Sequence, residues 1–214
     1  MGLREEKRTA LRQAIADTAV RLFRTRGYDR TPVQEIARRV RVSEATFFNH
    51  FPSKQALLDS FTLDLIEGYG ALLRDKLREE DRPVSDRIRE TVVLVGQSFA
   101  ADRELMALVA TRSNLFYATT DAARARHHAA YDLLAQLLRQ GQRGGEIRRD
   151  VDPVQLAEIL TATYMLTIAN WLLGWWGEEH DLGARLSQAV DVFLNGCRST
   201  AGTADRSTTR RRKP

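Results

Sequence analysis

The chain of 214 residues has one cysteine and five prolines, and both scarcities narrow the class of protein. Cys197 alone cannot close an intramolecular disulfide, and no cluster of Cys and His has the spacing of a zinc site. We therefore expect a protein of the reducing cytoplasm without a metal or a cofactor. With 43% hydrophobic and 29% charged residues, the composition argues against collagen-like and disordered chains.

The sequence also lacks a long apolar run. Residues 1–12 carry charges throughout, unlike a secretory signal, and the longest apolar segment, Tyr164 to Trp176, is interrupted by Asn170 and Gly174. That segment is too short to cross a bilayer, so we expect no membrane partner. Alternating β-branched runs are scarce, whereas Ala, Leu, Arg, Glu and Gln dominate. The sequence predicts an all-α fold.

The net charge of +5 is distributed unevenly along the chain. Residues 1–60 hold 12 Lys and Arg against 7 Asp and Glu, whereas residues 61–198 hold 16 against 20. A basic N-terminal part favours a polyanionic partner. Residues 199–214 hold 5 Lys and Arg against 1 Asp and have no apolar periodicity, so we expect a disordered basic tail.

Apolar residues recur at helical spacing through the first sixty residues. The stripe from Leu11 to Phe23 ends near Gly27, which favours a helix end. A capping box at Thr31 predicts a second helix, Ser43 is expected to cap a short third helix, and a fourth begins near Lys54. The short link between the second and third helices forces a steep crossing. This arrangement is typical of a helix-turn-helix.

Five longer apolar stripes follow, and all are expected to be helices. With the first four they predict about nine helices. We expect a three-helix DNA-binding helix-turn-helix domain over residues 1–52 and a larger helical domain over residues 53–198. The five stripes cover residues 84–101, 104–118, 122–141, 153–176 and 182–198.

The residues of the helix-turn-helix form a specific pattern. It runs TPVQEIA over residues 31–37 and VSEATFFNHFPSKQALL over residues 42–58. The pattern closely resembles the signature of the tetracycline-repressor (TetR) family of bacterial one-component regulators, over roughly residues 10–60. The resemblance implies a non-enzymatic DNA-binding regulator, most often a repressor, which forms a homodimer on a pseudo-palindromic DNA operator.

The third helix carries the expected DNA contacts. Its outer side has short polar groups and one small apolar residue, which suit a major groove, while Phe47 and Phe51 point inward. By resemblance, Ser43 begins this helix at the interface. The residues expected at phosphates are Thr31, Thr46, Phe48, His50 and Lys54, and those expected nearest base edges are Glu44, Ala45 and Asn49.

Two positions depart from the family pattern. Arg41 stands where the family most often has glycine, and a left-handed backbone there would cost roughly 1 kcal/mol. Phe48 replaces the usual tyrosine, so it lacks a hydroxyl for a phosphate. We expect the turn to form with Arg41 in place of glycine.

An aromatic stripe occupies the eighth expected helix. Tyr164, Ile168, Trp171 and Trp175 follow at i, i+4, i+7 and i+11, a spacing most common in plain core. The resemblance implies that this helix encloses part of an effector pocket, so we expect a mainly apolar, ring-containing small-molecule effector against it. Further candidates for the pocket are Phe99, Met106, Asn114 and Tyr117.

The last two helices have apolar residues on more than one face, a pattern that requires a second partner surface. The resemblance implies a four-helix bundle across a two-fold axis. The candidates for this dimer interface are Leu186, Val190, Phe193 and Leu194.

Two alternatives stay open. One is a DNA-binding regulator without an effector, in which the aromatic stripe is only core. The other is an all-α enzyme that uses Asp150, Asp152, Glu158, His127 and His128. Their spacing argues against the enzyme, because aspartates at a helix start serve as caps and adjacent helical histidines point to different faces. We expect no catalytic residue.

Overall fold

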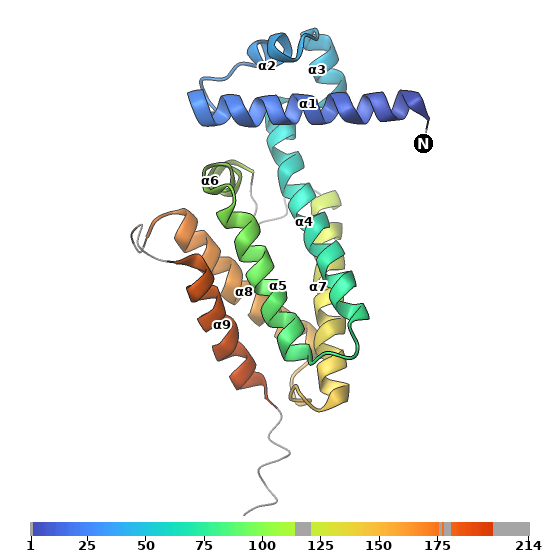
Figure 1. The fold of residues 1–214 in the computed structure, drawn as a ribbon, viewed down its shortest axis with the longest axis vertical. Coiled ribbons are helices and arrows are strands. Elements are labelled where there is room, and N and C mark those ends of the chain that lie inside the picture. Colours follow the sequence, from blue (N-terminus) through green and yellow to red (C-terminus); the bar gives the residue numbers. More distant parts are fainter. Residues whose placement is uncertain (1, 114–120, 176, 178–180, 199–214) are drawn as a thin grey trace, which may run out of the picture. The chain divides into compact units, whose positions relative to one another are not determined.

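The computed structural model describes residues 2–113, 121–175, 177 and 181–198. These residues form nine α-helices and no strand, as the sequence predicts (Figure 1). The predicted tail, 199–214, lies outside them. The helices are α1 (Leu3–Arg26), α2 (Val33–Val40), α3 (Glu44–His50), α4 (Lys54–Arg78), α5 (Val84–Ala100), α6 (Arg103–Arg112), α7 (Asp121–Gly144), α8 (Pro153–Leu172) and α9 (Leu182–Cys197).

The helices group into two compact units. The head comprises Met1–Leu65 and Asp102–Thr119, and the body comprises Ile66–Ala101 and Thr120–Pro214. α6 therefore belongs to the head, although α5 and α7 on either side of it in the chain belong to the body. The domain limits that we expect from the sequence, 1–52 and 53–198, stay a prediction.

The head has its own apolar core. Ile15 of α1, Ile36 of α2, Phe47 of α3 and Leu57 of α4 are fully buried in it, and Leu108 of α6 packs against them. Helices as short as α2 and α3 are marginal in water, so this burial is what stabilises them. The core therefore holds the helix-turn-helix in place.

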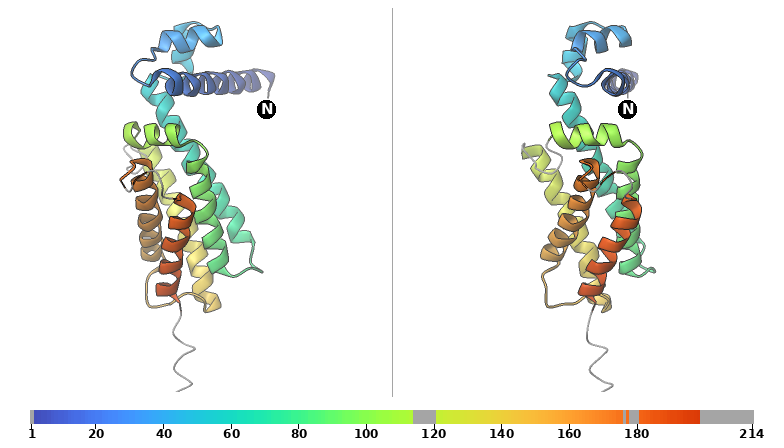
Figure 2. Two further views of the ribbon diagram at one scale, coloured as in Figure 1. Left: turned by 60° about the vertical axis from the view of Figure 1, so that its left-hand side comes forward. Right: turned by 90° about the vertical axis from the view of Figure 1, so that its left-hand side faces the viewer.

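The body is a helical bundle in which α5 packs on α9, α9 on α8 and α8 on α7 (Figure 2). Buried Ile88 and Val92 of α5 contribute to this core, together with Leu186 and Val190 of α9. A Cβ atom at Gly96 would collide with Leu186 Cδ1. Glycine therefore leaves the room that the Leu186 side chain occupies.

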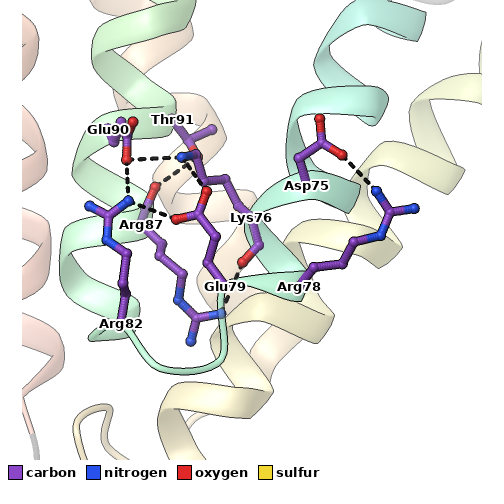
Figure 3. A network of polar contacts seen from close by, with 8 residues as sticks. All are labelled: Asp75, Lys76, Arg78, Glu79, Arg82, Arg87, Glu90 and Thr91. Carbon is purple, nitrogen blue, oxygen red and sulfur yellow. Dashed lines mark hydrogen bonds and ion pairs between the residues drawn. The ribbon is translucent and has the colours of Figure 1, made fainter.

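An ionic network ties the end of α4 to α5 within the body (Figure 3). The buried Lys76 ammonium lies 2.7 Å from a Glu79 oxygen and 2.9 Å from a Glu90 oxygen, and Arg82 pairs with the same glutamates. Burial opposes the charge of Lys76, but the hydrogen bonds to the two carboxylates outweigh it and raise the pKa of Lys76. Arg87 donates to the Lys76 carbonyl oxygen at 2.9 Å, so this end of α4 is firmly anchored.

Within the described residues, no helix is both long and apolar enough to span a membrane. The same residues contain no group of three or more His, Cys, Asp and Glu side chains arranged to hold a metal ion.

Candidate nucleic-acid interface and effector domain

The turn between α2 and α3 contains a left-handed residue. Arg41 has φ 61° and ψ 42°, as expected from its place in the pattern, and the Val42 amide donates to the Ala37 carbonyl at 3.0 Å. Ser43 then caps α3 by accepting a hydrogen bond from the Thr46 amide at 3.0 Å, which confirms the predicted cap. These local contacts fix the direction in which α3 leaves α2.

Replacing Arg41 by glycine is expected to stabilise the protein by about 0.5–1 kcal/mol, because glycine adopts this conformation without Cβ strain. Thermal unfolding measures the change. Arg39→Gly is the matched control, since Arg39 is an exposed residue inside α2, where glycine should destabilise by about 0.5–1 kcal/mol. A fall in melting temperature for Arg41→Gly as large as that of the control would contradict the strain argument.

α3 presents a mixed polar surface to solvent. Glu44, Ala45, Phe48 and Asn49 are exposed, whereas Phe47 is fully buried. Residues at i, i+1, i+4 and i+5 share one side of a helix, so the four exposed side chains form a single face. Expected contacts Thr46 and His50, on the same helix, are half-buried.

Thr31 does not cap α2. Its side chain is fully buried, and its hydroxyl donates back to the Gly27 carbonyl oxygen at 2.8 Å. The N-cap of α2 is Pro32, with no side-chain hydrogen bond, so the predicted capping box is wrong. The hydroxyl closes the loop after α1 instead. A phosphate contact from the Thr31 side chain would require this loop to open.

Lys54 also stabilises the loop between α1 and α2. Its ammonium donates to the Tyr28 carbonyl oxygen at 2.8 Å and to the Thr31 carbonyl oxygen at 3.0 Å, and it lies 4.2 Å from the centre of the Tyr28 ring. Burial lowers the pKa of Lys54. An ammonium has three N–H donors, so one donor beyond these two contacts can still serve a phosphate.

Arginines of α1 border the C-terminal end of α3. Arg12 donates to the His50 carbonyl oxygen at 2.6 Å, and its guanidinium lies 4.0 Å from the centre of the Phe51 ring. Burial, and then the charges of Arg12 and Arg8, lower the pKa of His50. At neutral pH His50 therefore offers a neutral hydrogen-bonding ring. Arg12 is not among the contacts predicted from the sequence, although its i, i+4 spacing from Arg8 places both on one face of a helix.

α6 is held to the rest of the head near both ends. Asp102, the N-cap of α6, forms an ion pair with Arg24 of α1. At the other end, Arg112 pairs with Asp29 at 2.7 Å, and Gln55 of α4 donates to the Arg112 carbonyl oxygen at 2.8 Å. α6 is therefore fastened to both α1 and α4, so a shift of α6 would strain the head.

The effector candidates occupy different environments. Tyr164, Ile168 and Phe99 are buried in the body, and Trp171 is half-buried. α8 ends at Leu172, so the aromatic stripe does not continue, and Trp175 is 68% exposed. Met106 is buried in the head. Asn114 and Tyr117 lie outside the described residues.

The four dimer candidates are buried within the single chain. Leu186, Val190, Phe193 and Leu194 form the inner side of α9, with exposed fractions of 0%, 1%, 7% and 4%. They have little surface left to offer a partner, because the body already covers them. An interface on α8 and α9 must use other positions. The large apolar residues exposed along these helices are Val154, Ile159, Leu166 and Val192.

The residues that an enzyme would use have other roles or different environments in the fold. Asp152 caps α8 by accepting from the Val154 amide at 2.8 Å. A hydrogen bond from Arg148 lowers the pKa of Asp150 to about 2. His127 is half-buried and His128 is exposed, as expected for neighbours that face different sides of a helix.

Comparison with known protein families decides the classification. Residues 15–61 match the model described as bacterial regulatory proteins of the tetR family, and residues 83–172 match a tetracyclin repressor-like C-terminal domain. The chain belongs to the TetR family. This confirms the resemblance seen in the sequence, and it makes the protein a DNA-binding transcriptional regulator with an effector-binding domain.

Individual relatives of this TetR-family protein are distant. The transcriptional repressor DhaR of Mycobacterium sp. (strain GP1) is 27% identical over 73% of this chain and 80% of DhaR. The uncharacterized regulator YuxN of Bacillus subtilis (strain 168) is 50% identical, but over only 21% of this chain and 15% of YuxN. This chain spans only 36% and 51% of the lengths of two further relatives.

Among solved structures, FadR of Thermus thermophilus has a similar fold. It is a TetR-family repressor crystallised with lauroyl-CoA, and it superposes with a TM-score of 0.66 at 27% identity. The match covers 86% of this chain and 94% of FadR. The similarity therefore extends well beyond the helix-turn-helix.

Proposed function

We propose that this TetR-family protein is a homodimeric repressor that leaves a pseudo-palindromic operator when a mainly apolar small molecule binds its body. The observation that carries the proposal is the exposed face of α3, held by a capped and left-handed turn on a buried core. Such a face can enter a major groove without unfolding its own support. The protein would act in the cytoplasm, where the DNA is, and without catalysis.

The proposed DNA contacts divide by chemistry. Glu44, Ala45 and Asn49 are exposed on α3 and would lie nearest base edges, beside Phe48. Ser43, Thr46, His50 and Lys54 would hold phosphates around them, and the basic Arg8 and Arg12 of α1 add positive charge near His50. Phosphate contacts position the helix, and base contacts select the sequence.

The proposed dimer interface uses the exposed side of α8 and α9. Leu166 is 62% exposed and Val192 is 74% exposed, and Ile159 lies seven residues before Leu166 on α8. Exposed apolar groups of this size favour burial against a second copy. Two copies would place two α3 helices for half-sites about 34–36 Å apart, or a multiple of that distance.

The proposed signal passes through α6. Only Ala101 and Asp102 separate α5 from α6, so a movement of the end of α5 is passed on to the N-cap of α6. Asp102 pairs with Arg24 and so carries the movement into α1. Phe99, one turn before this junction, is buried in the body and is a candidate to sense the effector.

The apolar interior of the body supports a mainly apolar effector. Tyr164, Ile168 and Phe99 are buried there, and Trp171 is half-buried. The similarity to a repressor crystallised with lauroyl-CoA is consistent with an apolar portion in the effector. To weaken operator binding a hundredfold, the effector must prefer the non-binding conformation by about 2.7 kcal/mol.

Operator release tests the proposal. Labelled DNA from the region flanking the coding sequence is titrated with protein and then with a panel of apolar compounds, and fluorescence anisotropy reports binding. We expect at least one compound both to change tryptophan fluorescence and to release the DNA. A panel in which no compound releases specifically bound DNA would favour the second candidate, a constitutive DNA-binding regulator whose aromatic residues are only core.

A further inference from the structure

The Tyr164 hydroxyl is buried in the body without a hydrogen bond of normal length and direction. Its residue is only 2% exposed, and none of the described residues supplies the hydroxyl with a partner of suitable geometry. Burial raises the pKa of Tyr164 to about 12, and weak hydrogen-bonding contacts with Tyr69 and Thr161 oppose part of that rise. Buried hydroxyls in folded proteins nearly always have a partner, so this one requires an explanation.

Other neutral polar groups surround it from three helices. The Tyr69 ring of α4 meets the Tyr164 ring edge-on, with centroids 6.3 Å apart. Tyr131 of α7 lies close enough to influence the pKa of both tyrosines. Thr161 precedes Tyr164 on α8 by three residues and therefore lies on the same side of that helix. The body thus brings the Tyr164 hydroxyl near two other phenols and the Thr161 hydroxyl.

A second polar group without a partner, the His127 imidazole, lies on α7 one turn before Tyr131. His127 precedes Tyr131 by four residues, so the two share a face of the helix. Its Nε2 atom is also buried and has no partner among the described residues. Burial, and then the charge of His128, lower the pKa of His127, so the ring is neutral at neutral pH. Tyr164 and His127 thus each carry a buried polar atom without a partner of normal geometry, and neither side chain is ionised at neutral pH.

We propose that the Tyr164 hydroxyl and the His127 imidazole bind an uncharged oxygen, a carbonyl or a hydroxyl, on an otherwise apolar effector. This inference rests on the proposed function and specifies the chemistry of its effector. A phenol donates readily to a carbonyl, and a neutral imidazole can either donate to a bound oxygen or accept from a hydroxyl. A carboxylate would lose its hydration there without a cation among these neighbours.

The first test uses the protein without effector. Tyr164→Phe removes only the unpaired oxygen, so its melting temperature should equal or exceed that of the unchanged protein. A clear fall in melting temperature would overturn the proposal, since it would show that the hydroxyl already has a structural partner.

The second test uses two matched sets of probes, one naphthyl and one decyl, each with a hydrocarbon, an alcohol, a methyl ketone and a carboxylate. Calorimetry measures their affinities for the full chain. In at least one set, the alcohol or the ketone should bind at least tenfold more tightly than the hydrocarbon and the carboxylate. Tyr164→Phe should abolish that advantage and leave hydrocarbon binding unchanged. Tightest binding of a carboxylate or a hydrocarbon would overturn the proposal, and so would no binding in either set.

Operator release, measured separately, distinguishes this inference from the proposed function. A ketone that binds through Tyr164 but does not release DNA would support the inference and count against effector control. A compound that releases DNA equally well from the unchanged protein and from Tyr164→Phe would support effector control and overturn the inference.

Discussion

Replacing Leu166 by aspartate is expected to separate the dimer into folded monomers and to weaken operator binding at least 100-fold. Leu166 is 62% exposed on α8, so the substitution adds no charge to the core of the body. In the proposed dimer, each copy would bury one unpaired carboxylate in an apolar interface, which costs about 3 kcal/mol or more. Sedimentation measures the mass, and anisotropy measures operator affinity.

Leu94→Asp is the matched control for this substitution. Leu94 is also an exposed leucine, but it lies on α5, outside the proposed interface. The control should remain dimeric and bind the operator normally. If Leu166→Asp also remained dimeric at micromolar concentration, the interface would have to lie elsewhere.

Replacing Asn49 by alanine is expected to weaken operator binding about 5- to 150-fold, because a side-chain amide that contacts a base edge contributes about 1–3 kcal/mol of discrimination. Asn49 is exposed on α3, so the fold should not change. Affinity for random DNA, and the salt dependence of binding, should stay as they are, since no phosphate contact is lost.

Gln13→Ala is the control for Asn49, because Gln13 is an exposed amide on α1 that bonds to Asp17 within its own helix. It should bind the operator normally. Equal losses on operator and random DNA for Asn49→Ala would remove Asn49 from the base contacts.

Local contacts in the head could be predicted from the sequence because neighbouring residues determine them. Ser43 caps the helix that follows it, and Arg41 stands at the position of the turn between α2 and α3 that has a left-handed backbone. Phe47 and Phe51 lie inside because their spacing puts both on the inner side of α3. Such features depend on a few residues along the chain.

Features that depend on distant residues could not be predicted. The apolar stripe of α9 shows that Leu186 and Val190 are buried, but not whether α5 or a second subunit buries them. Thr31 satisfies its hydroxyl at the end of α1 rather than at the start of α2. The sequence also could not predict that the Tyr164 hydroxyl lacks a partner, because periodicity indicates burial and says nothing about hydrogen-bond partners.

The most direct test of sequence-specific, paired DNA binding is selection of DNA from a random-sequence pool by the unmodified protein. We predict that the selected duplexes share an inverted repeat whose half-sites lie one helical turn apart, 10–10.5 base pairs, or a multiple of that spacing. Asn49→Ala should lose the preference at one position in each half-site. Selected DNA without an enriched sequence, or with a single half-site and no inverted partner, would contradict the account.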